Sequence, residues 1–136
     1  MQMNPYLSFN GNCEEAFNFY EKNLGGKILA SMTYEGTPMA EQVPAEWRKK
    51  IIHARMALGE TLLMGSDAMP DRYEGTKGFS LNLNAKDPAE AERLFLALSE
   101  KATVTMTLQP TFWALRFGML VDQFGISWMV NCEKPR

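Results

Sequence analysis

Two stretches of nine residues decide the fold, because they repeat one pattern. Residues 12–20 read NCEEAFNFY, and residues 87–95 read DPAEAERLF. The matching pairs all stand 75 positions apart: Asn12 and Asp87, Glu15 and Glu90, Ala16 and Ala91, Tyr20 and Phe95. Asn or Asp followed three residues later by Glu is typical of a helix start, and the apolar residues behind it recur at helical spacing. Repetition at one fixed offset indicates a duplicated unit with one helix in each copy.

Four strands accompany each predicted helix. The first helix covers residues 13–24 and ends at Gly25-Gly26, which supply a left-handed cap. Alternating apolar and polar residues predict strands at 4–10, 27–34, 51–58 and 61–66, then at 79–84, 103–108, 116–121 and 126–132. Residues 35–50 show no clear period and are predicted to form a long loop. The expected fold is α+β, a single domain of 1–136 with two tandem βαβββ modules, about 1–68 and 78–136, and a linker at 69–77.

The composition bounds the class of protein. The chain has 136 residues, a formal net charge of −2 and 46% hydrophobic residues, which suits one folded domain with a real core. No basic excess is available for a nucleic acid or an anionic membrane surface, so neither partner is expected. No stretch approaches the roughly 20 apolar residues that a spanning helix needs, and no charged-then-apolar leader opens the chain. We therefore expect a cytoplasmic protein.

Strand alternation separates a helix-covered face from an open face. Pairing Leu58 with Thr61 across the Gly59-Glu60 turn puts His53 and Arg55 on the open face. The side chains expected under the helices are Leu7, Phe9, Ile52, Ala54, Met56, Leu63, Phe79, Leu81, Leu83, Ile126, Trp128 and Val130. Those expected on the open face are Tyr6, Ser8, His53, Arg55, Met64, Ser80, Asn82, Ser127, Met129 and Asn131. Such a mixture of polar, aromatic and Met side chains is typical of a pocket wall.

His53 is the only histidine of the chain, so sites built on several imidazoles are excluded within one chain. Two interpretations of it stay open. As a catalytic or ligand-binding residue, it would accept a proton or bind an anion beside Arg55. As a structural residue, it would form a hydrogen bond to a neighbouring strand or lie at a dimer interface.

Four further side chains also carry two interpretations each. Arg55 and Arg116 could clamp an anion with their guanidinium groups, or could pair with Asp or Glu elsewhere in the fold. Trp113 could stack on a flat ligand or be buried between two chains. Cys13 begins a helix, where the dipole can lower a thiol pKa, but it also continues the helix's apolar stripe, which favours the core.

Several motifs resemble the vicinal oxygen chelate superfamily, and within it the PhnB-like proteins. The two strand-helix-three-strand units agree with its architecture. The similar segments are Asn4-Pro5-Tyr6-Leu7-Ser8-Phe9, Gly11-Asn12-Cys13-Glu14-Glu15-Ala16, Ile52-His53-Ala54, Ser66-Asp67-Ala68-Met69-Pro70, Thr111-Phe112-Trp113-Ala114 and Asp122-Gln123-Phe124-Gly125. They cover nearly the whole chain. The resemblance implies a curved, mostly antiparallel eight-stranded sheet with a central cup, often completed in a homodimer.

The resemblance also implies a metal site, from which this sequence departs. Metal-using members place His, Gln or Glu on the first, fourth, fifth and last strands. The corresponding places here hold Asn4 or Tyr6, Met64, Ser80 and Met129, a poor set for a divalent ion. We therefore expect no metal and no other cofactor. The chain also has no Gly-rich strand-to-helix turn for a nucleotide cofactor.

Three hypotheses of function follow. The first is a small-molecule binder whose cup is lined by Tyr6, His53, Arg55, Ser80, Asn82, Trp113 and Arg116, with no metal. The second is an enzyme of lyase or isomerase type that uses His53 as a base, or a metal site completed by its substrate. The third is a structural dimer module whose cup is filled by its own side chains. The sequence does not name the ligand and leaves open whether the protein is an enzyme.

Overall fold

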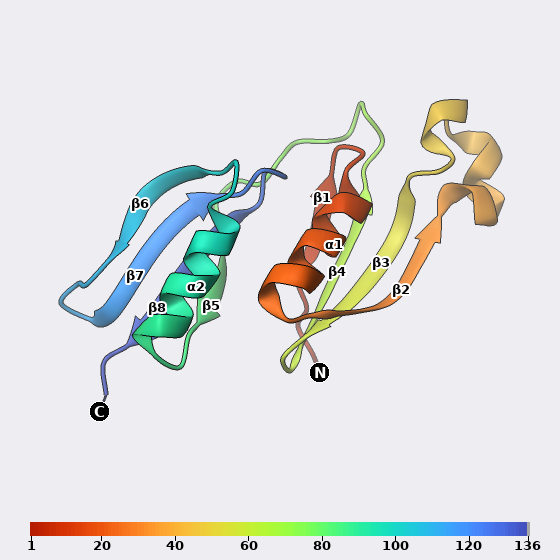
Figure 1. The fold of residues 1–136 in the computed structure, drawn as a ribbon. Helices are drawn as coiled ribbons and strands as arrows, with labels where there is room; N and C mark the ends of the chain where they lie inside the picture. The colour runs from red at the N-terminus through yellow and green to blue at the C-terminus, as the bar shows by residue number, and fades with distance from the viewer. Residues whose placement is uncertain (136) are drawn as a thin grey trace. The chain divides into compact units, whose positions relative to one another are not determined.

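A computed structural model describes residues 1–135 (Figure 1). The chain divides into two compact units, Met1–Gly75 and Thr76–Arg136, and the division falls inside the segment expected to be a linker. Each unit holds one α-helix and one four-stranded sheet. None of the helices in the described part of the chain is long and apolar enough to cross a membrane.

The first unit is a βαβββ module. Its elements are β1 (Tyr6–Phe9), α1 (Cys13–Leu24), β2 (Lys27–Thr33), β3 (Ile51–Leu58) and β4 (Thr61–Asp67). The strands lie in the order β1-β4-β3-β2, with β1 parallel to β4 and the other neighbours antiparallel. The segment expected to be a long loop contains three short 3-10 helices, Tyr34–Gly36, Pro38–Gln42 and Ala45–Trp47.

The second unit repeats this topology. Its elements are β5 (Leu81–Asn84), α2 (Pro88–Leu98), β6 (Thr103–Gln109), β7 (Ala114–Val121) and β8 (Ser127–Glu133). The strand order is β5-β8-β7-β6, with β5 parallel to β8 and the other pairs antiparallel. The α+β class and the two tandem βαβββ modules are thus confirmed. One eight-stranded sheet around a shared cup stays a prediction.

Each helix covers one face of its own sheet. In the first unit, α1 buries Phe17 and Tyr20 against sheet residues such as Leu7 and Met56, all 2% exposed or less. A glycine brings the helix close: a β-carbon at Gly65 would lie 3.0 Å from the Phe17 ring. The expected pairing of Leu58 with Thr61 is confirmed. Arg55 on β3 and Met64 on β4 are therefore paired and lie on the same face of the sheet, as the sequence predicts.

Phe79 does not lie under a helix. The sequence placed it in a strand beginning at residue 79, but β5 begins at Leu81 and the Phe79 side chain is 55% exposed. Trp128 and Val130 on β8, and Ile126 just before it, are 1% exposed or less and belong to the core of this unit. Strand β8 lies between β5 and β7 and supplies buried apolar surface. Phe79 does not contribute to it, because β5 begins two residues later than the sequence predicts.

A bulge in β3 interrupts the expected alternation at Ile52. Met32 pairs with His53, whereas Thr33 pairs with Ile51, so Ile52 is an extra residue in β3 without a partner on β2. Strict alternation placed Ile52 with Ala54 under the helix. Instead Ile51 is the buried residue, at 2% exposure, whereas Ile52 is half-buried and lines a pocket with Tyr34 and Val43.

The cap of α1 also differs from the expectation. Asn12 makes no side-chain capping bond, and its Oδ1 is buried without a partner among the described residues. Asp67 replaces it, because its Oδ1 accepts the Cys13 backbone N–H at 2.9 Å. In α2 the expected cap is confirmed, since Asp87 accepts the Glu90 backbone N–H at 2.8 Å.

Candidate functional site

A hydrogen-bonded Tyr–His pair lies on the open face of the first sheet. The Tyr6 hydroxyl and the Nδ1 of His53 are 3.2 Å apart, and the two ring centroids are separated by 5.8 Å. Tyr6 is 47% exposed and His53 is half-buried. This contact engages Nδ1, and Nε2 is the other donor or acceptor of the imidazole ring.

Strand register explains how residues 47 positions apart meet. Tyr6 on β1 pairs with Met64 on β4, and Met64 pairs with Arg55 on β3. His53 lies two residues from Arg55 on the same strand, so both side chains face away from α1. We call the surface formed by Tyr6, Met32, His53, Arg55 and Met64 the open face of the first unit.

Arg55 is exposed on this face and forms no salt bridge with any of residues 1–135. Arg116 behaves differently, because its Nε lies 3.4 Å from Glu92 Oε1 and its Nη1 donates to the Leu115 carbonyl at 2.7 Å. The alternative left open for Arg116, pairing with an acidic residue, is therefore the one observed. An anion clamp made by both arginines stays a prediction.

One candidate of the second unit, Asn82, belongs to an amide cluster on β5 and β8. Asn84 Oδ1 accepts hydrogen bonds from Asn82 at 3.0 Å and from Asn131 at 3.2 Å. Ser80 lies just before β5 and is half-buried. Sequence reasoning left Asn84 out of the site, although it alternates with Asn82 on the same strand and that period could have found it.

Trp113 lies in the turn before β7. Its ring packs edge-on against Phe112, with centroids 4.7 Å apart, and against Phe117 at 5.3 Å. Phe112 is 86% exposed and Trp113 is 46% exposed. Both stacking on a flat ligand and burial between two chains remain compatible with this exposure. The shared cup that would join Trp113 to Tyr6 and His53 likewise stays a prediction.

The residues at the superfamily's usual ligand places do not fit a divalent metal. On the first sheet they are the phenol of Tyr6, already bonded to His53, and the thioether of Met64. On the second they are Ser80 and Met129, a hydroxyl and another thioether. Hard divalent ions prefer carboxylate and imidazole ligands, which none of the four places supplies. Residues 1–135 also hold no group of three or more His, Cys, Asp or Glu suited to a metal ion.

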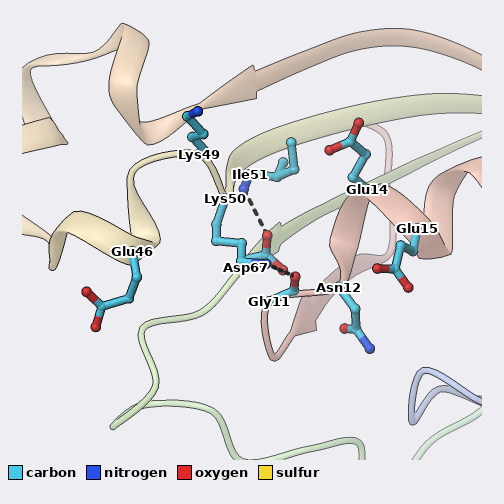
Figure 2. A pocket seen from close by; sticks show the side chains of 9 residues that line it. All are labelled: Gly11, Asn12, Glu14, Glu15, Glu46, Lys49, Lys50, Ile51 and Asp67. Carbon is cyan, nitrogen blue, oxygen red and sulfur yellow. Dashed lines mark hydrogen bonds between the residues drawn. The ribbon is translucent and has the colours of Figure 1, made fainter.

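A pocket of about 310 Å³ adjoins the start of α1, and Figure 2 shows its lining side chains. Asp67 lies at its inner end, where Oδ2 accepts the Ile51 backbone N–H at 2.8 Å. Lys50 Nζ donates to the Gly11 carbonyl at 2.9 Å. Both charged groups thus hold the backbone in place, which favours a structural role for this region.

Cys13 belongs to the core beside that pocket. It is fully buried, and burial raises the pKa of its thiol well above the usual range, helped by the negative charges of Asp67 and Glu14. The pKa of Tyr34 is raised in the same way, by burial first and then by Asp67 and Tyr6. The core interpretation of Cys13 therefore holds, because a protonated buried thiol is a poor nucleophile.

Comparison with known proteins now adds to this geometry. The family model of 3-demethylubiquinone-9 3-methyltransferase matches residues 1–131. The chain belongs to this family. Protein YjdN of Escherichia coli strain K12 is a relative at 35% identity, over 100% of this chain and 98% of its own length.

Solved structures of similar proteins extend the family assignment. Protein PA1353 from Pseudomonas aeruginosa is 51% identical, with a TM-score of 0.90 over 99% of both chains. A putative 3-demethylubiquinone-9 3-methyltransferase, PhnB protein, from Bacillus cereus is 24% identical, with a TM-score of 0.82 over 97% of this chain and 99% of its own. The fosfomycin resistance protein FosX from Listeria monocytogenes, at 7% identity, has a TM-score of 0.67 over 98% of this chain and 93% of its own. The chain thus shares the glyoxalase/bleomycin resistance fold with the PhnB and FosX structures.

Proposed function

We propose that this protein binds a small organic anion on the open face of the first unit, without a metal. The observation that carries the proposal is the exposed guanidinium of Arg55, without a salt bridge among residues 1–135, beside the Tyr6–His53 pair. Guanidinium matches a carboxylate or phosphate in a two-pronged hydrogen bond. The second imidazole nitrogen and the Tyr6 hydroxyl supply further polar contacts to the same ligand.

The family name suggests methyl transfer, but the residues give it little support. Nucleoside-containing cofactors are commonly held at a Gly-rich turn between a strand and a helix. The residues between β1 and α1 are Asn10-Gly11-Asn12, and those between β5 and α2 are Ala85-Lys86-Asp87. Gly25-Gly26 comes after α1, where Gly25 has a φ of 77° and acts as the helix cap. Binding of an organic anion therefore accounts better for the residues on the open face.

A binding experiment tests this proposal. The purified protein is titrated with butanoate and with methylphosphonate by calorimetry, as the wild type and as Arg55→Gln. At least tenfold weaker binding is expected in the variant, because a charge-assisted hydrogen bond is lost. Lys22→Gln is the control, since it removes an exposed charge from α1 on the opposite face. Equal binding by wild type and Arg55→Gln would contradict the proposal.

Proton transfer by His53 is a second candidate, favoured by its bond to Tyr6. The hydroxyl orients the imidazole, as a positioned base requires. If the protein is such an enzyme, His53→Ala abolishes proton exchange at carbon next to the carboxylate of a bound substrate while the fold persists. Deuterium incorporation from heavy water into the carbon between the ketone and the carboxylate of acetoacetate, followed by NMR and compared with the rate in buffer alone, measures this exchange.

A further inference from the structure

A second pocket, of about 340 Å³, lies within the first unit and includes one residue of β3, Ile52, in its lining. Its inner wall is apolar and comes from the 3-10 segments, from β3 and from the chain after β4: Met39, Val43, Ile52 and Met69. The buried ring of Tyr34 completes it, and the Tyr34 hydroxyl is tied to the Asp67 carbonyl at 2.8 Å. The charged residues of the lining, Asp71 and Arg72, are exposed. This pocket suits an uncharged, flexible group.

The pocket and the proposed anion-binding residues share strand β3. Ile52 is the extra residue of the bulge and lines the pocket, and His53 follows it directly. Arg55 comes three residues after Ile52, a separation of about 10 Å along an extended strand. One ligand of medium length can therefore lie along β3, with its apolar end beside Ile52 and its charged end at Arg55.

We propose that the ligand is an amphipathic monoanion, a carboxylate or phosphonate with a medium-length alkyl chain whose tail enters the Met39–Val43–Ile52–Met69 pocket. This inference rests on the proposed function, since the anion is held by Arg55 and His53. The flexible thioethers of Met39 and Met69 fit an alkyl chain, because Met side chains adapt to irregular apolar groups. The pocket therefore sets the length of the ligand, whereas Arg55 selects its charge.

Chain-length dependence tests the inference separately from the proposed function. Dissociation constants are measured by calorimetry for butanoate, hexanoate and octanoate. In the wild type, affinity is expected to rise about threefold to fourfold for each added methylene that enters the pocket. In Met39→Trp, which fills the pocket, the three carboxylates are expected to bind with nearly equal affinity. Met39 is 40% exposed, so the larger ring can be accommodated.

Two further variants keep the test decisive. Met39→Asp places a charge at the pocket wall and should also remove the chain-length dependence. It provides the same test if Met39→Trp does not fold. Leu96→Trp adds the same ring to exposed α2 in the other unit and should leave the dependence unchanged. Binding of all three carboxylates without chain-length dependence in the wild type, or with full dependence in Met39→Trp, would overturn the pocket assignment alone. Absence of binding by every carboxylate would instead overturn the proposed function.

Discussion

Asp67 is the single residue that ties most of the first unit together. It is 1% exposed, and its carboxylate accepts the backbone N–H groups of Cys13 and Ile51 while its carbonyl accepts the Tyr34 hydroxyl. One side chain thereby fixes the start of α1 and the start of β3. In the sequence Asp67 stands out only as part of the Ser66–Pro70 motif, because no local pattern reveals an acceptor that serves backbone groups 54 and 16 positions away.

Asp67→Asn should lower the free energy of unfolding by about 2 kcal/mol. The amide keeps one acceptor but turns an N–H donor toward a buried backbone N–H, so one hydrogen bond is lost and both of these donors are left unsatisfied. Urea denaturation of wild type and variant measures the difference. Asp71→Asn is the matched control, since Asp71 is exposed and its loss should change stability by less than about 0.5 kcal/mol.

The raised pKa of Cys13 predicts a loss of stability at alkaline pH. In the folded protein the thiol stays protonated, whereas in the unfolded chain it ionises near its ordinary pKa of 9.0. The unfolded state therefore binds fewer protons above that value, so the free energy of unfolding falls as the pH rises beyond it. Urea denaturation at increasing pH should show the decline, and Cys13→Ala should reduce it. An unchanged slope in the variant would assign the decline to other groups.

At the scale of elements, glycines set the distance between helix and sheet. A β-carbon at Gly118 on β7 would lie 2.6 Å from the Phe95 ring of α2 and 3.0 Å from the Leu108 Cα. Gly65 on β4 has the same relation to Phe17 of α1. Each module thus packs an aromatic ring of its helix against a glycine in its sheet.

Gly118→Ala should destabilise the protein by about 1–3 kcal/mol, because an added methyl group in a filled core forces neighbours to shift. The Leu108 backbone is one of those neighbours, so relief by side-chain rotation alone is excluded. Thermal unfolding followed by circular dichroism measures the effect. Gly36→Ala serves as the control, since nothing lies within 4 Å of its added carbon. Equal melting temperatures for the two variants would contradict this packing.

At the scale of the whole molecule, the repeated pattern predicted the architecture well. The helix over Cys13–Leu24 and the β3–β4 register followed from capping, period and turn chemistry, which are local in sequence. The open-face positions of Tyr6, His53 and Arg55 followed from alternation. What sequence could not provide were non-local features: the Asp67 cap and the Arg116–Glu92 pair. The bulge at Ile52 escaped because alternation assumes a regular ladder.

The homodimer expected from the resemblance stays a prediction at this scale. Large apolar side chains such as Phe112 and Leu96 are 86% and 75% exposed in the single chain. Contiguous exposed apolar surface is typical of protein interfaces. Light scattering should give twice the chain mass of 15.4 kDa. Phe112→Ser should lower the measured mass if the Phe112–Trp113 pair lies at the interface. A value of one chain mass for the wild type would contradict the dimer.

The single histidine allows the most direct measurement of the central claim, that an organic anion binds beside Arg55 and the Tyr6–His53 pair. Because the chain has one His, its imidazole NMR signals are assigned without further variants. Titration with octanoate should shift the His53 ring signals in a saturable way in the wild type, and Arg55→Gln should need at least tenfold more ligand for the same shift. His53 signals that stay unchanged at saturating octanoate, or that shift equally in Arg55→Gln, would contradict it.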